Sequence, residues 1–219
     1  MGIAIKLLRN DYPAAQLSVF RNLFGMVPCL IALYFSYDWH QNGRKVVIKQ
    51  WRLGLLRGAF VALAQLCLYT SYFYLPFALV ATMEYTGPMM VTLLSIPLLG
   101  EKFGWFKMSA VISGFIGIVL IMQPWSADFN YIILLPVIAA FGYSLARVTS
   151  LSFSMDVPSP LINIYAQIGT ICVSMILVLS LDMWESFRSL YDLLIFFLMG
   201  LAGGTGTLLL IYGARKAEL

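Results

Sequence analysis

Seven long apolar segments constrain this chain more than any other feature of its sequence. A helix needs roughly 20 mostly apolar residues to cross the hydrocarbon core of a bilayer. The segments cover residues 14–36, 53–74, 77–99, 105–123, 131–153, 160–181 and 191–213, with short polar or turn-forming breaks between them. The pattern predicts an all-α fold, a polytopic bundle of membrane-spanning helices without an inserted soluble domain.

Composition supports the same class. Only 11% of the 219 residues are charged, 61% are hydrophobic, and the mean hydropathy is +0.86, whereas soluble domains have about 25% charged residues. The net charge of +4 does not indicate a nucleic-acid partner, because the basic residues lie at the segment ends. The bilayer itself is the expected partner. The apolar stretch before Lys6 and Arg9 is too short for a signal peptide or a span.

The distribution of basic residues predicts an orientation, because Lys and Arg concentrate in cytoplasmic loops. One side of the bundle carries Arg44, Lys45, Lys49, Arg52, Lys102, Lys107, Arg215 and Lys216. The opposite side carries Asp128, Asp182, Glu185 and a single basic residue, Arg188. We therefore expect a multi-pass protein of the plasma (inner) membrane, with its N-terminal end outside and its C-terminal end in the cytoplasm.

Small residues mark expected helix contacts, because they let backbones approach closely in lipid. Ala110, Ser113, Gly114 and Gly117 form one stripe, and Gly200 and Gly204 form a GxxxG pair. A weak repeat relates residues 56–68 to residues 198–210. The two segments are an odd number of spans apart, so they run in opposite directions, as in inverted-repeat transporters.

Two charges lie inside predicted spans, where an unpaired charge is costly. Arg21 and Glu84 both lie roughly 11–12 Å below the outer surface at 1.5 Å per residue. This equal depth permits an ion pair that holds two helices together. The alternative is a wet Glu84 that binds substrate or a proton. Pro88 favours the second reading, because a mid-span proline frees the carbonyl of Glu84, and such breaks lie against protein or a cavity.

Other polar side chains form two stripes. Gln65, Tyr69 and Tyr72 share one helix face, and Tyr143 and Arg147 share another. Each stripe suits a wet cavity, although core hydroxyls satisfied by neighbouring helices and an Arg147 that snorkels to the surface are equally simple readings. The complete candidate set for a substrate cavity is Gln65, Tyr69, Tyr72, Glu84, Tyr85, Pro88, Tyr143, Arg147, Thr205 and Thr207.

The sequence offers little for catalysis. Cys29, Cys67 and Cys172 are far apart, and the single histidine, His40, lies in a loop. No spacing suits a metal site, no span carries a Ser/His couple, and no lysine lies at mid-span to form a Schiff base. We therefore expect neither an enzyme nor a metal or cofactor.

Residues 75–124, from LPFALVATMEYTGPMM through LLGEKFG to SGFIGIVLIMQP, resemble the core of the EamA family of the drug/metabolite transporter superfamily. The likeness rests on Pro88 and Glu101, and it extends to LSVFRNLFG, LLRGAF, AAFGYSLARVTS and LMGLAGGTGTLLLIYGARKAE. The resemblance implies ten helices in two inverted halves of five. Residues 1–124 would form the first half, with most of its first helix missing. Residues 131–219 would form the second half, without its last two helices.

The resemblance also implies a function. Relatives carry amino acids, S-adenosylmethionine, riboflavin and similar polar solutes, so we expect a secondary transporter of a small organic metabolite that works by alternating access. It implies that Gln65, Tyr69, Glu84, Pro88, Tyr143 and residues 204–207 lie near the pathway, and that Arg21 lies on a more peripheral helix. In relatives position 84 is usually small, so Glu84 would be specific to a subgroup. The alternative is a truncated, transport-inactive fragment or a partner-dependent subunit, and homo-oligomerisation stays open.

Overall fold

A computed structural model describes residues 2–41, 43–100, 104–125, 130–154 and 156–217, and every regular element in these ranges is a helix. Seven helices or helix pairs are long and apolar enough to cross a membrane. They are α2 (Ala14–Tyr34), α4 (Trp51–Tyr74), α5 (Phe77–Glu84) with α6 (Thr86–Leu99), α7 (Trp105–Met122), η1 (Tyr131–Leu134) with α8 (Leu135–Leu151), α9 (Ser159–Ser180) and α10 (Leu190–Ala217). All seven predicted spans are confirmed, within about two residues at each end. Two short helices, α1 (Gly2–Leu8) and α3 (Tyr37–Gln41), flank α2 in the sequence.

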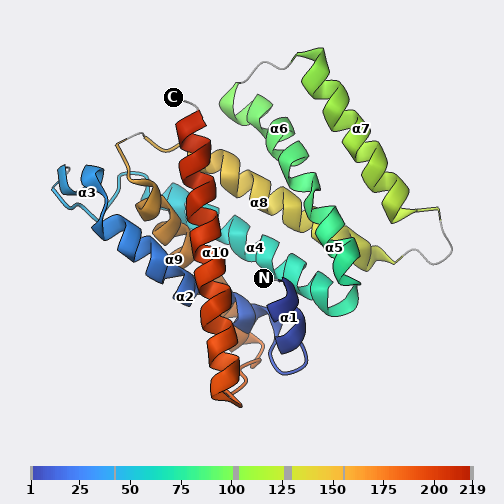
Figure 1. Cartoon of the computed structure of the whole chain (residues 1–219), viewed down its shortest axis with the longest axis horizontal. Coiled ribbons are helices and arrows are strands. Elements are labelled where there is room, and N and C mark those ends of the chain that lie inside the picture. Colours follow the sequence, from blue (N-terminus) through green and yellow to red (C-terminus); the bar gives the residue numbers. More distant parts are fainter. Residues whose placement is uncertain (1, 42, 101–103, 126–129, 155, 218–219) are drawn as a thin grey trace.

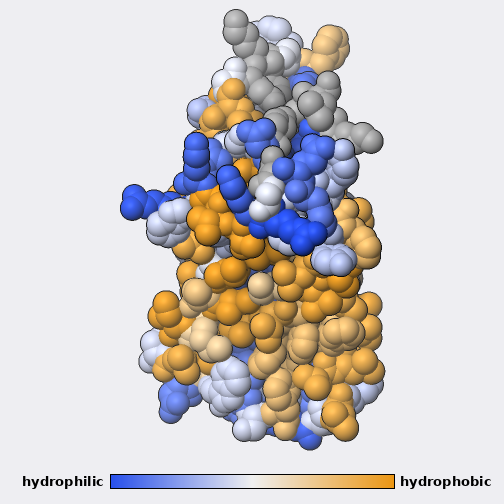
Figure 2. Space-filling view, turned by 90° about the vertical axis from the view of Figure 1, so that its left-hand side faces the viewer, coloured by the Kyte–Doolittle hydropathy of each residue, from blue (hydrophilic) through white to orange (hydrophobic). Residues whose placement is uncertain are grey.

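The helices form a packed group with one loosely attached edge. Helix α2 packs against α9 and α10, and α4 packs against α8 and α9. The α5–α6 pair covers α8, and α7 lies beyond α6 at the periphery (Figure 1). A broad apolar surface occupies one side of the molecule, with hydrophilic residues above it and along its lower edge (Figure 2). This distribution is what a bilayer requires of the residues that face it.

Glycines set the closest helix crossings. A Cβ on Gly204 would lie 2.8 Å from the Gly25 Cα, and a Cβ on Gly200 would lie 3.0 Å from the Gly25 nitrogen. The expected GxxxG contact is therefore confirmed, with α2 as its partner. The crossing of α4 and α9 is equally close, because a Cβ on Gly58 would lie 2.7 Å from the Gly169 Cα.

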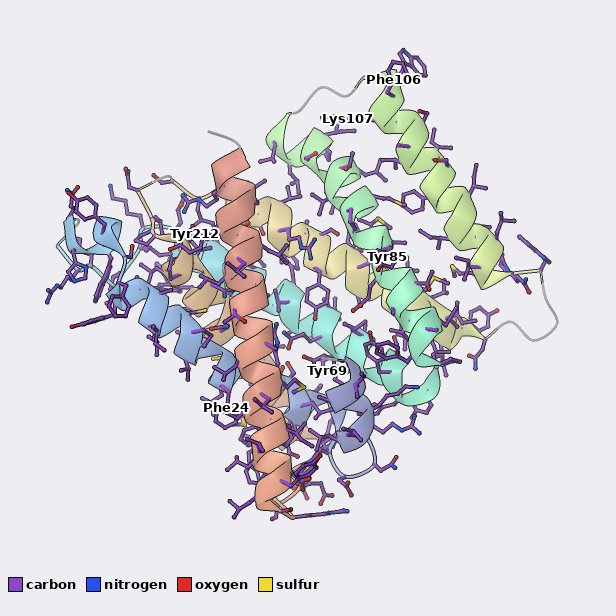
Figure 3. All side chains as sticks on the ribbon, in the orientation of Figure 1. Phe24, Tyr69, Tyr85, Phe106, Lys107 and Tyr212 are labelled. Carbon is purple, nitrogen blue, oxygen red and sulfur yellow. The ribbon has the colours of Figure 1, made fainter. Side chains whose placement is uncertain are left out.

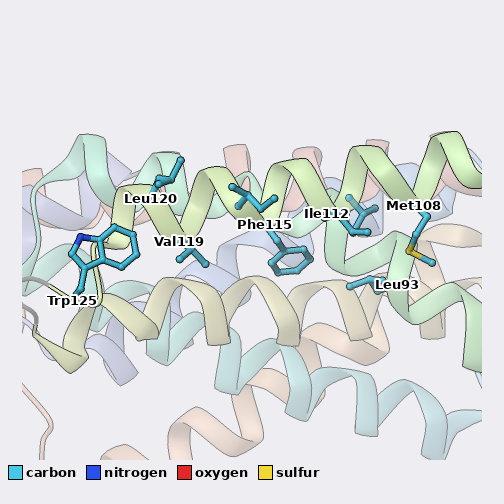
Figure 4. Close-up of a pocket in the computed structure, with 9 residues that line it drawn as sticks. Leu93, Met108, Ile112, Phe115, Val119, Leu120 and Trp125 are labelled. Atoms are coloured by element: carbon cyan, nitrogen blue, oxygen red, sulfur yellow. The ribbon is translucent and has the colours of Figure 1, made fainter.

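The predicted small-residue stripe on α7 is only partly a contact surface. A Cβ on Gly114 would collide with the Met89 side chain of α6, whereas Gly117 has no atom within 4 Å of its would-be Cβ. An apolar groove of about 470 Å³ runs along α7, with Leu93 of α6 at one end (Figure 4). It is lined by Leu93, Met108, Val111, Ile112, Phe115, Ile116, Val119, Leu120 and Trp125. The stripe therefore touches α6 at Gly114, whereas Gly117 has no close neighbour.

The loop before α10 is held against the start of α2. Gln16 uses both ends of its amide on the Glu185 backbone, donating to the carbonyl at 2.7 Å and accepting from the nitrogen at 3.0 Å. The Tyr12 hydroxyl donates to the Asp192 carboxylate at 2.9 Å and accepts from the Arg188 nitrogen at 3.1 Å. Burial is the main reason why the pKa of Tyr12 lies above its ordinary value. These bonds fix the end of the bundle opposite the Lys- and Arg-rich loop.

The helix that carries Glu84 is interrupted as predicted. Helix α5 ends at Glu84, Tyr85 separates it from α6, and Pro88 lies in the first turn of α6. Proline has no N–H to give to the Glu84 carbonyl, so the regular pattern cannot continue across this point. The Ser144 hydroxyl of α8 lies 2.9 Å from the Gly87 carbonyl oxygen, so the interruption rests against α8.

The glycine crossing of α2 and α10 can be tested with a matched pair of substitutions. We expect Gly204→Ala to lower the stability of the folded protein by about 1–3 kcal/mol, because overpacking a tight contact displaces backbone. Gly206→Ala is the control, since nothing lies within 4 Å of its would-be Cβ. Thermal unfolding in detergent measures both. Equal melting temperatures for the two variants would contradict the crossing.

Candidate functional site

Arg21 does not pair with Glu84, so this prediction is wrong. Arg21 is 4% exposed, and its guanidinium donates to the Asn22 Oδ1 at 2.8 Å and to the Gly203 carbonyl at 3.3 Å. In the described residues the ion pair within 4 Å is Arg188 with Asp11, which lie before α10 and before α2. The equal depth of Arg21 and Glu84 did not determine the direction in which each side chain points around its helix axis. Arg21 lies in the α2–α10 contact, and α5 packs on α8 instead.

Gln65 belongs to a closed cluster of hydrogen bonds and does not line an open surface. Its side chain is fully buried, and its Oε1 accepts from the Ser18 hydroxyl at 2.6 Å and from the Asn22 amide at 2.8 Å. The Ser174 hydroxyl of α9 donates to the Ser18 hydroxyl at 2.9 Å. We call Ser18, Asn22, Gln65 and Ser174 the polar cluster. It joins α2, α4 and α9, and it corrects the cavity role expected for Gln65.

Three members of this cluster, Ser18, Asn22 and Ser174, were not predicted from the sequence. Ser18 lies three residues before Arg21, and Asn22 lies one residue after it. Because a helix repeats every 3.6 residues, Ser18 and Asn22 share one face. That spacing could have been used to predict a polar face on this helix. Ser174 gave no signal, because a lone serine in an apolar span usually bonds to its own helix.

Tyr69 is also buried, with no exposed surface. Its hydroxyl has no hydrogen-bond partner among the described residues, as is also true of the Arg21 Nε and both amide atoms of Gln167. Figure 3 shows Tyr69 on α4, deep in the packed group, and Tyr85 at the junction of α5 and α6. Tyr69 is therefore buried in this structure, and its expected place beside a solute path stays a prediction.

A second group of polar side chains combines the buried Tyr72, which is 4% exposed, with two exposed charges. We call Tyr72, Glu84, Tyr143 and Arg147 the polar face. The Tyr72 hydroxyl donates to the Glu84 Oε2 at 3.4 Å. Glu84 and Arg147 are exposed and Tyr143 is half-buried. Tyr143 and Arg147 lie one turn apart on α8, which packs against α5, the helix that ends at Glu84. A hydrogen bond thus joins Tyr72 to Glu84, and helix packing brings α5 against the helix that carries Tyr143 and Arg147.

The remaining predicted residues lie elsewhere or beside this face. Tyr85 (73% exposed) and the exposed Pro88 follow Glu84 directly at the helix interruption. The Thr205 hydroxyl donates within its own helix, to the Leu201 carbonyl at 2.6 Å. Thr207 accepts from the Asn163 amide at 3.1 Å, so it belongs to the contact between α9 and α10.

Two further points concern the expected chemistry. Among the described residues no group of three His, Cys, Asp or Glu side chains is arranged to hold a metal. Glu101, on which part of the family resemblance rests, lies outside the described residues, as do Lys102 and Asp128.

Replacing each of two buried glutamines tests the polar cluster, because the two substitutions should change the stability of the protein differently. We expect Gln65→Leu to destabilise the protein by about 1–3 kcal/mol, because it leaves the buried Ser18 and Asn22 groups without their acceptor. Gln167→Leu should cost less, because it removes an amide that is 3% exposed and whose nearest polar group is the weakly bonding Cys29 thiol. Melting temperatures in detergent measure both changes. A larger loss for Gln167→Leu would contradict the assignment.

Comparison with known proteins points to one family. A family model described as the EamA-like transporter family matches residues 1–123. A riboflavin transporter of Vibrio cholerae is 45% identical over 80 residues, which is 35% of this chain and 26% of that protein. An S-adenosylmethionine uptake transporter of Rickettsia prowazekii is 23% identical over 203 residues, which is 90% of this chain and 65% of that protein.

The corresponding protein of Rickettsia bellii is 23% identical over 211 residues, or 94% of this chain and 68% of its own length. The chain therefore spans about two thirds of the length of these S-adenosylmethionine transporters. No solved structure matches. Because the family match covers more than half of a chain that also has seven apolar helices, this protein belongs to the EamA-like transporter family.

Proposed function

We propose that this protein is a secondary transporter that moves a small polar organic metabolite across the membrane by alternating access. The observation that carries the proposal is the polar face. Two opposite charges, Glu84 and Arg147, are exposed on helices that must cross the bilayer. Ionisable side chains within spans face the bundle interior or water, because exposure to lipid is expensive. A water-filled path along this face accommodates both charges.

The relatives support the chemical class. Proteins named as S-adenosylmethionine and riboflavin transporters carry organic solutes with many polar groups. The interruption of the helix pair α5–α6 supports the mechanism, because discontinuous helices at membrane depth are a recurrent feature of transporter binding sites. Tyr72 holds the Glu84 carboxylate beside the interruption, so a change at the helix junction would move the charge.

The orientation belongs to the same proposal. The exposed Arg44, Lys45 and Arg52 lie in the described part of the basic loop, and Arg188 stands on the opposite side in an ion pair with Asp11. A pair of opposite charges contributes little net positive charge to the outer side. By the positive-inside rule, we expect the C-terminal end of α10 on the cytoplasmic side of the plasma membrane.

Uptake into proteoliposomes tests the function. We expect the protein to accumulate labelled S-adenosylmethionine or riboflavin, and we expect Glu84→Gln to reduce the rate at least roughly tenfold, which equals about 1.4 kcal/mol of lost interaction. Glu185→Gln is the control, because it makes the same chemical change on an exposed loop residue.

Two outcomes would count against the proposal. Equal rates for the two variants would remove Glu84 from the path. A correctly inserted protein that moves no labelled solute would favour the alternative of a transport-inactive chain that needs a partner.

A further inference from the structure

An apolar groove lies at the end of α2 that leads into the basic loop. It has a volume of about 330 Å³, and we call it the α2–α9 groove. Its lining comes from the last turns of α2, from α3, from the loop after α3 and from the first turns of α9, and it includes Leu30, Tyr34, Trp39, Val46, Leu161 and Ile164. Figure 1 shows α3 at this end of α2, with α9 beside it. Because two spans end here, the groove lies where the bilayer meets water, the level that Trp and Tyr prefer.

Trp39 connects this groove to two basic residues. Its carbonyl accepts from the Arg44 nitrogen at 2.9 Å, and its indole nitrogen donates to the Lys45 carbonyl at 3.2 Å. The next residue, Val46, lines the groove, and its carbonyl accepts from the Tyr165 hydroxyl of α9 at 3.1 Å. Bonds from two helices therefore hold the backbone of residues 44–46 along the edge of the groove.

The same edge carries positive charge. The side chains of Arg44 and Lys45 are exposed, although their backbone is held by Trp39. Between Phe35 and Arg52 the sequence has four basic residues, and Asp38 is the one acidic residue. An apolar channel at the membrane surface thus ends at an edge with an excess of positive charge.

This combination fits an anionic lipid better than the other occupants of an apolar groove. A second copy of this chain, packed through the same surface, would bring its own Arg44 and Lys45 to a symmetric contact, where like charges repel. A zwitterionic lipid fills the apolar part but has no net charge to offer the two cations. A phospholipid with a net negative headgroup supplies both an acyl chain for the groove and a partner for its edge.

We infer that the α2–α9 groove is a binding site for an anionic phospholipid. Part of an acyl chain lies against Trp39 and Val46, and the phosphate lies at Arg44 and Lys45. The residues of this site are on α2, α3, α9 and the loop after α3, whereas those of the polar face are on α4, α5 and α8. The inference therefore does not depend on which solute the protein carries.

Quenching of fluorescence by brominated lipids tests the site, because Trp39 lines it. One variant keeps Trp39 and has phenylalanine in place of the other four of its five tryptophans. It is reconstituted in mixed bilayers of phosphatidylglycerol and phosphatidylcholine, in which one lipid or the other has brominated acyl chains. We expect Trp39 to prefer phosphatidylglycerol by roughly tenfold, the scale set by two basic residues at a membrane surface.

Two controls separate a site from general attraction. A variant that keeps only Trp125 measures the groove along α7, whose lining is apolar throughout, and it should show little preference. Arg44→Gln combined with Lys45→Gln should lower the preference at Trp39 to the value at Trp125. Lys49→Gln combined with Arg52→Gln removes the same charge from exposed positions nearby and should lower it less.

The unaltered chain gives a second measure that needs no change of tryptophan. In detergent, added phosphatidylglycerol should raise its melting temperature more than phosphatidylcholine with the same acyl chains does. Arg44→Gln combined with Lys45→Gln should remove this difference.

Several outcomes would overturn the inference. Equal preferences at Trp39 and Trp125, or equal losses in the two double variants, would indicate general attraction without a site. Equal shifts of the melting temperature by the two lipids would contradict the preference for an anionic headgroup. Protection of Trp39 from both brominated lipids would show that a protein chain covers the groove instead.

Discussion

The structure depends on the need to satisfy polar groups without water. In the hydrocarbon region a buried donor or acceptor without a partner inside the protein is costly. The polar cluster meets this need for α2, α4 and α9 at once, through Ser18, Gln65 and Ser174. Asn22 extends it to Arg21, which in turn reaches the Gly203 carbonyl of α10. Four helices are thereby fixed in one arrangement.

Close backbone contacts reinforce the same arrangement. Gly25 and Gly204 bring α2 against α10, and Gly58 and Gly169 bring α4 against α9. In lipid the attraction between helices comes from packing and from interhelical hydrogen bonds, and small residues allow both. The exposed charges Glu84 and Arg147 lie on α5 and α8, outside these two glycine crossings.

The sequence predicted the fold well and the site incompletely. The length of the apolar segments was enough to predict all seven spans, and Pro88 was enough to predict the interruption beside Glu84. Both features depend only on the sequence of a single helix. The partner of Arg21 could not be predicted in this way, since depth in the membrane says nothing about direction around a helix axis. Gln65 was misplaced for the same reason, because it lies in the buried polar cluster. The expected place of Tyr69, Tyr72, Glu84, Tyr143 and Arg147 beside a solute path remains a prediction. The inverted repeat and the division into halves at residues 124 and 131 remain predictions.

Water access at the polar face is the central claim, and thiol labelling measures it most directly. Single cysteines replace Glu84, Arg147, Ser174 and Ile116 in a protein whose Cys67 and Cys172 are alanine and whose buried Cys29 is kept. A membrane-impermeant, hydrophilic thiol reagent reacts with thiolate in water. The account predicts fast labelling at positions 84 and 147, and slow labelling at 174 in the polar cluster and at 116 on exposed α7. Labelling at 84 and 147 no faster than at 116 would contradict it.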